Sequence, residues 1–312
     1  MNTPPTPDEV NSLFTNNDPD LVWRKAVDVI RRISPAFDFT VTQIVFNDIM
    51  SLFRGEYPGF CPIKTLYHNL HHTLDVFLCA VRLMHGVKLS GKNMSDREIT
   101  VVVIAALMHD VGYAQHLGED NGTGAQHTQN HVARSIVFMQ QYIAEKQLPV
   151  SLIAQITPVL LCSNPALNIS DIEFPDERIQ LCGKILGTAD LTGQMADRTY
   201  LEKLLFLFLE FEEAGFYNYQ NIHELLRNTG IFYETTQARL REQFDGIDAQ
   251  LSLHFKEWYG IEANYYLESI EKNLAYLAKI TSLNDAKHLS MLKRGGIVEN
   301  LNLNQDLPST PP

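Results

Sequence analysis

The sequence has few cysteines, and their spacing excludes the sites that clustered cysteines build. Only four occur in 312 residues, and no two of them form a CxxC motif. Disulfide scaffolds and structural zinc sites both need closely spaced cysteines. We therefore expect buried free thiols in a protein of a reducing compartment. The four are Cys61, Cys79, Cys162 and Cys182.

Long hydrophobic runs and an excess of positive charge are also lacking. No apolar stretch reaches the ~18 residues that span a bilayer, and residues 1–5 lack the basic and apolar pattern of a signal sequence. The formal net charge is -12, from 25 Lys and Arg against 37 Asp and Glu. We expect a cytoplasmic protein that binds no nucleic-acid polymer and no membrane. A small anionic nucleotide stays open as a ligand, because a metal can dominate the field of one pocket.

The alternation of apolar and polar residues that marks strands is absent, and helical spacing takes its place. Apolar residues recur at helical intervals over 22–33, and the apolar runs 101–107 and 204–209 are too long for typical strands. The sequence therefore predicts an all-α fold with one helical domain. We expect an N-terminal tail over 1–18, the domain over 19–285 and a C-terminal tail over 286–312.

Start signals place several of the expected helices. Ser95-Asp96-Arg97-Glu98 fits a capping box, and Pro175-Asp176-Glu177 suits the start of a helix that carries Asp190. Thr40 is expected to cap another helix. The expected helices cover about 22–33, 41–54, 64–85, 96–110, 125–147, 150–162, 176–191, 199–214, 220–229, 234–256 and 262–281.

The most informative feature is a set of histidines and carboxylates in three segments, namely 68–75, His109-Asp110 and Asp190. Since His109 and Asp110 end a strongly apolar run, burying them without a partner would be costly. Imidazole nitrogens and carboxylate oxygens are common ligands of Mn, Fe, Zn, Co and Mg. The pattern therefore predicts a divalent metal site, and with it a hydrolase.

Within the segment 68–75, the spacing of the side chains suggests a different role for each of them. His68 and His72 are four residues apart, so on the expected helix they share one face. One can then bind the metal while the other faces the substrate. Asp75 is placed to orient a ligand histidine through its second ring nitrogen.

Residues 67–76 fit the pattern YHNxxHxxDV at every fixed position. Together with His109-Asp110 and the later Ala189-Asp190-Leu191, this pattern resembles the HD-domain superfamily of metal-dependent phosphohydrolases. Residues 67–76 are similar in particular to the signature of cyclic-nucleotide phosphodiesterases. The resemblance covers about 67–191 and implies an HD/phosphodiesterase-like helical bundle.

The resemblance also implies a role for each matching residue. His68 would be the general acid that protonates the leaving oxygen, and histidine is a good proton donor near neutral pH. Asp110 would bridge to a second ion, and two ions could hold a hydroxide and neutralise phosphoryl oxygens. Asn69 and Asp75 would contact the metal ligands without binding the ion themselves. The ligands of the first ion would be His72, His109, Asp110 and Asp190.

The sequence departs from the phosphodiesterase pattern at three places. One is the gap of 80 residues from Asp110 to Asp190, which is shorter than in eukaryotic phosphodiesterases and closer to compact bacterial HD domains. That family continues HDxxH, but Tyr113 stands where the last histidine belongs. The missing histidine normally shapes the second metal site, so the number of ions, one or two, stays open. The glutamine that clamps a purine base has no clear counterpart, because Gln243 has the wrong spacing.

Several further residues are candidates for a second metal or phosphate site. His127 and His131 are four residues apart on the expected helix after a glycine-rich loop, and the loop residues Glu119 and Asp120 are alternatives to them. Arg134 and Lys184 could bind phosphate, although a surface or structural role is the simpler interpretation of each. The acidic cluster of Glu210, Glu212 and Glu213 is expected to form a solvated face.

The function that these features favour is a metal-dependent phosphodiesterase for a small nucleotide, with 3',5'-cyclic nucleotides among the candidate substrates. One alternative is a phosphomonoesterase for a nucleotide or another small phosphate, which would need more positive charge in its pocket. Another is a catalytically reduced HD-type protein that senses a nucleotide. The presence of His68 and of all four ligand candidates favours an enzyme over a sensor, whereas Tyr113 mildly favours the sensor. The ligand candidates are His72, His109, Asp110 and Asp190.

Overall fold

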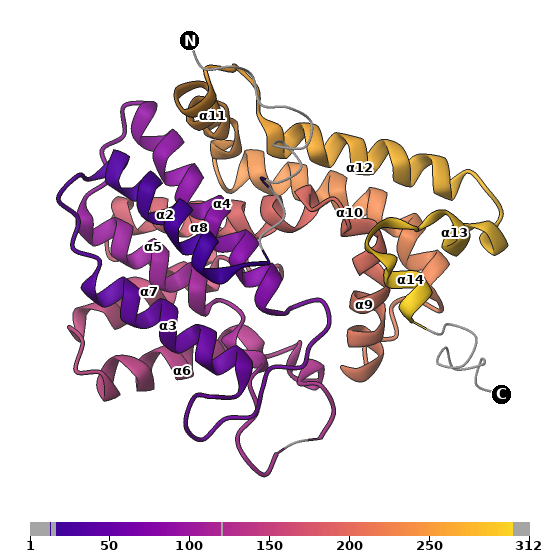
Figure 1. The fold of residues 1–312 in the computed structure, drawn as a ribbon, viewed down its shortest axis with the longest axis horizontal. Coiled ribbons are helices and arrows are strands. Elements are labelled where there is room, and N and C mark those ends of the chain that lie inside the picture. Colours follow the sequence, from indigo (N-terminus) through magenta and orange to yellow (C-terminus); the bar gives the residue numbers. More distant parts are fainter. Residues whose placement is uncertain (1–12, 14–16, 120, 302–312) are drawn as a thin grey trace.

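The computed structural model describes Leu13 and residues 17–119 and 121–301. Throughout these residues the elements are helices, and the one β-type contact is an isolated bridge between Phe60 and His116. The predicted all-α fold is confirmed (Figure 1). Most of the expected N-terminal tail, Asp120, and residues 302–312 of the expected C-terminal tail lie outside the described residues.

Two helices form the centre of the fold, α4 (Leu70–Leu89) and α8 (Glu177–Ala196), and they pack against each other. Every α4 residue from His72 to Val87 is buried, as expected of a helix that is surrounded by others. Helix α5 (Asp96–Met108) packs against both and buries its apolar run 101–108 completely. The ligand candidates therefore lie on or next to the most buried helices of the protein.

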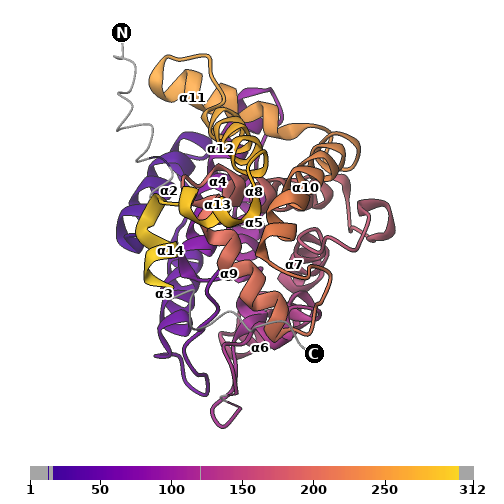
Figure 2. The same ribbon diagram turned by 90° about the vertical axis from the view of Figure 1, so that its right-hand side faces the viewer.

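The other helices cover this centre on two sides, as the two views show (Figures 1 and 2). Helices of the N-terminal half lie on one side, namely α2 (Pro19–Ile33), α3 (Thr40–Arg54), α6 (His131–Glu145) and α7 (Ser151–Leu161). Helices of the C-terminal half follow, namely α9 (Tyr200–Glu213), α10 (Ile222–Glu242), α11 (Leu251–Tyr259) and α12 (Tyr265–Thr281).

Helix start signals were accurate where a capping side chain is present. Ser95 forms the predicted capping box with Glu98, and Asp176 caps α8 through its contact with the Ile179 amide. Thr40 is instead the first residue of α3, and its amide and hydroxyl donate to Asp38. The prediction that Thr40 is the cap was wrong, because Asp38 supplies the acceptor.

The helix with the histidine cluster begins six residues later than predicted, at Leu70 rather than Lys64. Asn69 caps it by accepting a hydrogen bond from the His72 amide, and the Thr65 hydroxyl donates to the His68 carbonyl at 2.6 Å. These contacts hold the preceding residues in an irregular turn. The prediction that His68 and His72 share a helix face was therefore wrong, since His68 precedes the helix.

Two other boundaries differ for local reasons. The predicted helix over 125–147 is divided into the short 3-10 helix η2 (Ala125–His127) and α6, so His127 and His131 are not on one helix. The gap predicted between the helices 220–229 and 234–256 is absent, because α10 continues through Gly230. The chain breaks later, at Gly246, which has a φ of 59°.

The last described residues pack on the domain. Helices α13 (Asp285–Met291) and α14 (Ile297–Asn300) fall in the range 286–312 that we expected to be a tail. The Arg294 amide between them donates to Glu202, and its guanidinium donates to the Asn273 side chain. These partly buried polar contacts hold a segment that its composition did not predict to be ordered.

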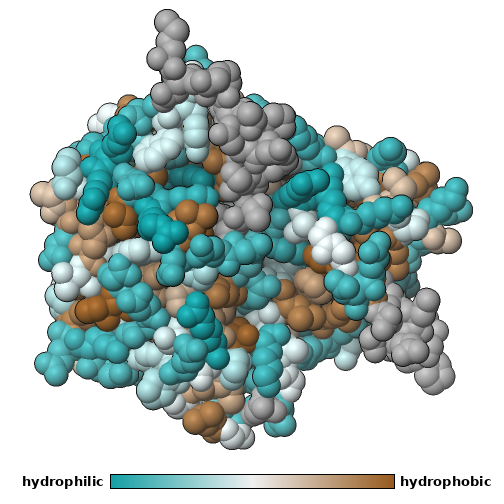
Figure 3. All heavy atoms as spheres, in the orientation of Figure 1, coloured by the Kyte–Doolittle hydropathy of each residue, from teal (hydrophilic) through white to brown (hydrophobic). Residues whose placement is uncertain are grey.

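No helix in the described part of the chain is long and apolar enough to cross a membrane. On the face shown in Figure 3, hydrophilic and hydrophobic side chains are interspersed.

Candidate metal centre

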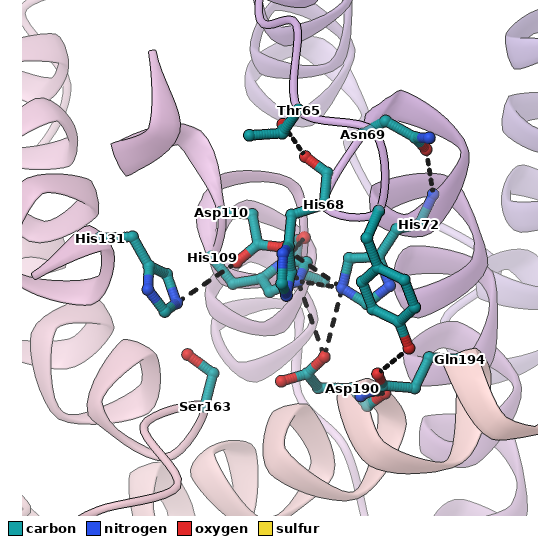
Figure 4. A network of polar contacts seen from close by, with 12 residues as sticks. Thr65, His68, Asn69, His72, His109, Asp110, His131, Ser163, Asp190 and Gln194 are labelled. Carbon is teal, nitrogen blue, oxygen red and sulfur yellow. Dashed lines mark hydrogen bonds and ion pairs between the residues drawn. The ribbon is translucent and has the colours of Figure 1, made fainter. Parts of the chain in front are cut away.

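Four side chains from three separate segments converge in the buried centre (Figure 4). The Nε2 atoms of His72 and His109 lie 3.2 Å apart, and Asp110 Oδ2 lies 3.2 Å from the first and 3.3 Å from the second. Asp190 Oδ1 completes the group, at 3.4 Å from His72 Nε2 and 3.8 Å from His109 Nε2. The structure thus brings together all four residues proposed as ligands of the first ion.

Backbone contacts aim these side chains at one another. His109 directly follows α5, and its Nδ1 donates to the Ala106 carbonyl at 2.8 Å, which leaves Nε2 to face the centre. Asn69 fixes the start of α4 and thereby the backbone of His72. Because α8 packs against α4, Asp190 on α8 lies next to His72 on α4. Such outer contacts are the usual means of orienting metal ligands.

The arrangement could hold a divalent metal ion. Ligand atoms at ~2.1 Å from one ion lie roughly 3 to 3.5 Å from each other, and the observed separations are similar. Asp110 Oδ2 is buried without a hydrogen bond, an unfavourable state that a cation would relieve. Two imidazoles and two carboxylates also form a ligand set suited to several first-row metals.

The charges of the cluster also favour a cation. Burial lowers the pKa of His72, but Asp110 and Asp190 raise it more, to about 9. His109 has the same balance of burial against these carboxylates, and its pKa is also raised to about 9. Burial opposes ionisation of Asp110, yet His109 and His72 hold its pKa well below the usual value. A metal ion would therefore compete with protons for these imidazoles.

His68 lies beside the cluster and is held by Glu210. Its Nδ1 is 2.6 Å from Glu210 Oε2, and the Tyr67 amide donates to Glu210 Oε1 at 2.6 Å. Burial lowers the pKa of His68, but Glu210 outweighs this effect, so the net shift is upward. The second ring nitrogen remains for the cavity next to the metal ligands.

The prediction that Glu210 belongs to a solvated face was wrong, because only 2% of it is exposed. Helix α9 turns Glu210 toward the segment before α4, while Glu213 accepts hydrogen bonds from the backbone and hydroxyl of Thr123. Nothing in the local sequence separated Glu210 from its acidic neighbours. Its role depends on a contact between distant segments.

Asn69 and Asp75 act differently from each other. Asn69 supports the site as the cap of α4. Asp75 forms an ion pair at 2.9 Å with His71, which is not among the proposed ligands. Asp75 thus also belongs to a neighbouring polar group, and its role in orienting a ligand histidine stays a prediction. His71, Asp75 and Asp197 could also hold a cation there, but Lys203 already contacts both His71 and Asp197.

Tyr113, which stands where the resembling family has a histidine, contacts two imidazoles whose ring centroids are 6.2 Å apart. Its ring stacks on His68 with centroids 4.9 Å apart and on His131 with centroids 4.8 Å apart. His131 Nδ1 donates to the Thr128 carbonyl, so its Nε2 faces Asp110 Oδ1 at 3.6 Å. Of the candidates for a second metal or phosphate site, His131 is the one that the fold brings to the centre.

The other three candidates lie elsewhere. Arg134 donates to the carbonyls of Gly112 and Ala114, both at 2.6 Å, and therefore braces the backbone after the His-Asp pair. Lys184 forms an ion pair with Asp245 at 2.6 Å. Neither they nor His127 line the cavity beside the cluster. Their side chains are occupied or directed away by contacts that sequence spacing does not reveal.

That cavity has a volume of about 370 Å³, and His68, Asp110, His131 and Asp190 form part of its wall. The rest is largely apolar and aromatic, and among the described residues no Lys or Arg lines it. The cluster that could hold a metal ion therefore lies next to space for an organic group. The apolar part of the wall includes Leu191, Leu207, Phe211, Phe216 and Phe232.

A comparison with protein families gives a partial match. A family described as Npun_R2479-like matches residues 117–243, which is less than half of the chain. The matched segment includes Asp190, Glu210 and His131, whereas His72, His109 and Asp110 precede it. No curated protein matches the chain.

Proposed function

We propose that this protein is an HD-domain-type, metal-dependent phosphodiesterase that acts on a small nucleotide. The observation that carries the proposal is the convergence of His72, His109, Asp110 and Asp190 beside the His68–Glu210 pair, at the wall of an open cavity. The resemblance of residues 67–76 to the phosphodiesterase signature agrees with this geometry. All four cysteines are buried and free, which also supports our placement of the protein in a reducing compartment such as the cytoplasm.

The four ligand residues would hold the ion, which would supply an activated water and neutralise phosphoryl oxygens. His68 would hold one proton toward Glu210 and present another to the cavity. Attack of water on phosphorus breaks one P–O ester bond, and the leaving oxygen takes its proton from His68. Burial lowers the pKa of His68, but Glu210 raises it by more and so favours the protonated imidazole that a general acid needs.

A diester is favoured over a monoester by the charge of the cavity. A phosphomonoester is close to a dianion at neutral pH and needs several positive groups. Among the described residues that line the cavity none is Lys or Arg, and Arg134 and Lys184 have partners elsewhere. A diester has one negative charge, which the metal centre alone could balance.

A second ion, if the protein uses one, would be held by Asp110 Oδ1 and His131 Nε2. Both atoms are acceptors when His131 is neutral, and burial lowers the pKa of His131. The 3.6 Å between them is similar to the separations in the first group. One to two equivalents of Mn, Fe, Zn, Co or Mg per chain would agree with this arrangement.

Metal analysis combined with ester hydrolysis tests the proposal. Purified protein would be assayed with bis(p-nitrophenyl) phosphate and p-nitrophenyl phosphate in the presence of Mn, alongside His68→Ala and Asp110→Ala. We expect bound metal and diester cleavage in the wild type, loss of both in Asp110→Ala, and retained metal with little turnover in His68→Ala. Preference for the monoester would favour the phosphomonoesterase. Bound metal without turnover of either ester would favour a sensor, and absence of metal would refute the proposal.

A further inference from the structure

A second cavity, of about 300 Å³, adjoins the first on the side of α10. Asp190 lines both cavities, so they meet at one of the proposed metal ligands. Figure 4 shows Ser163, another shared residue, near Asp190 and His131. The two spaces thus form adjoining compartments next to the same centre. The shared residues are Ser163, Pro165, Asp190, Leu191 and Phe232.

The two compartments differ in chemistry. The first is walled by leucine and phenylalanine side chains on the α9 side. The second is more polar, with hydroxyl, amide and charged side chains from α10 and the loop before α8. A ligand that fills both would place an apolar or planar group in one and a hydrogen-bonding group in the other. The polar lining includes Asn168, Thr235, Thr236, Arg239, Glu242 and Gln243.

Among the described residues that line either compartment, Arg239 is the one Lys or Arg. Its guanidinium donates to the carbonyls of Cys162, Asn164 and Pro165 at 3.0 to 3.2 Å. These contacts fix the loop that separates the compartments, and they fix the positive charge beside the polar one.

We infer that the substrate is a linear phosphodiester with two organic arms, of the dinucleotide class, and that each compartment holds one arm. The inference rests on the proposed function and specifies its substrate. A 3',5'-cyclic mononucleotide closes the diester on one sugar and carries one base, so it would leave the second compartment empty. Ligand sites commonly measure roughly 300–1,000 Å³, and two adjoining compartments at the lower end of this range suit a molecule in two parts.

The reaction would convert one dinucleotide and one water into two products. Water attacks phosphorus, the P–O bond to one arm breaks, and that arm leaves as an alcohol with a proton from His68. The proton that the attacking water loses restores the protonated His68. The phosphoryl group stays on the other arm as a monoester. Each product would then occupy only one compartment, which favours its release.

The test fills the second compartment without touching the centre. Thr235 is exposed on α10 and lines only that compartment, so Thr235→Trp would block it at little cost to folding. Glu234→Trp is the matched control, because Glu234 is exposed on the same helix and lines neither compartment. The substrates are adenylyl-(3'→5')-adenosine, 3',5'-cyclic adenosine monophosphate and bis(p-nitrophenyl) phosphate.

We expect the wild type to cleave the dinucleotide with a higher kcat/KM than the cyclic mononucleotide. Thr235→Trp should raise the KM for the dinucleotide about tenfold, the loss of about 1.4 kcal/mol of subsite binding. It should change kcat/KM for the cyclic mononucleotide, which has one base, less than twofold, and Glu234→Trp should change kcat/KM for none of the three substrates. A dinucleotide KM that is unchanged in Thr235→Trp, or preference for the cyclic mononucleotide, would overturn the inference while bis(p-nitrophenyl) phosphate turnover upholds the proposed function. Absence of all diester turnover in the wild type would overturn both.

Discussion

Glu210 and His68 are 142 residues apart in the chain, yet Glu210 Oε2 lies 2.6 Å from His68 Nδ1 in the folded protein. The carboxylate is buried, and it also accepts hydrogen bonds from the amides of Tyr67 and His68. It therefore fixes both the ring and the backbone of the proposed general acid.

Replacing Glu210 with Gln should impair the proton donor and leave the metal site intact. Without the carboxylate the pKa of His68 falls, so we expect kcat to drop about 10- to 100-fold, within the range that general acid catalysis contributes. The alkaline limb of the pH–rate profile should move to lower pH, and metal content should stay at the wild-type level. Glu212→Gln on the same helix is the control and should alter neither. An unchanged pH profile in Glu210→Gln would show that this contact does not tune His68.

Removing a ligand should abolish metal binding, whereas removing the nearby His127 should not. We expect His109→Ala to lose bound metal and diesterase activity at least about 100-fold, because one of four ligands is absent. His127→Ala should retain metal and activity within twofold, since His127 does not line the cavity. Metal content by mass spectrometry and turnover of bis(p-nitrophenyl) phosphate measure both effects. Wild-type metal content in His109→Ala would contradict the assigned ligand set.

The metal-free protein should become less stable as the pH rises above neutral. The pKa values of His72 and His109 are raised from 6.5 to about 9 in the fold. The folded state thus binds protons that the unfolded state has lost, and this contribution is complete below pH 6.5 and fades as the pH approaches about 9. We expect the urea midpoint in the presence of a chelator to fall between about pH 6.5 and about pH 8.5. Saturation with metal should reduce this fall, because the ion replaces the protons. A midpoint that rises over this interval would contradict the proton-linked balance.

Gly112 and Gly230 should respond in opposite ways to alanine. A Cβ at Gly112 would lie 1.9 Å from the His131 carbonyl oxygen, so Gly112→Ala must displace α6 from the His-Asp segment. We expect a loss of about 1–3 kcal/mol in unfolding free energy, as is usual for overpacking, together with weaker metal binding. Gly230 lies in α10 with no atom near its added Cβ, and Gly230→Ala should stabilise the protein by about 0.5–1 kcal/mol. Denaturant unfolding of both variants measures the pair, and equal effects would contradict the packing described.

Sequence patterns predicted those features that depend on local spacing. The capping box at Ser95 follows from residue type and separation along the chain, whereas the cluster of His72, His109, Asp110 and Asp190 was predicted from the resemblance of its motifs to a known family. Features that depend on contacts between distant segments could not be predicted in this way. Glu210 has the same local surroundings as a surface glutamate, and the occupation of Arg134 by two carbonyls follows only from the path of the chain after Asp110.

The start of α4 shows how a small local error changes an interpretation of function. Apolar periodicity continues before Leu70, and it concealed the turn that Thr65 and Asn69 stabilise. Placing His68 in the helix would have directed it along the same face as His72. In the turn it instead faces the cavity from another direction, and Glu210 can reach its ring.

The stack of His68, Tyr113 and His131 limits how the imidazole of His68 can turn. A catalytic ring in an open cavity usually samples several orientations, and selecting one of them costs entropy during every turnover. Here the ring of Tyr113 and the buried carboxylate of Glu210 hold the His68 ring in one orientation in the folded protein before a ligand binds. Tyr113 thus restricts the rotation of the His68 ring, from a position where the resembling family has an imidazole.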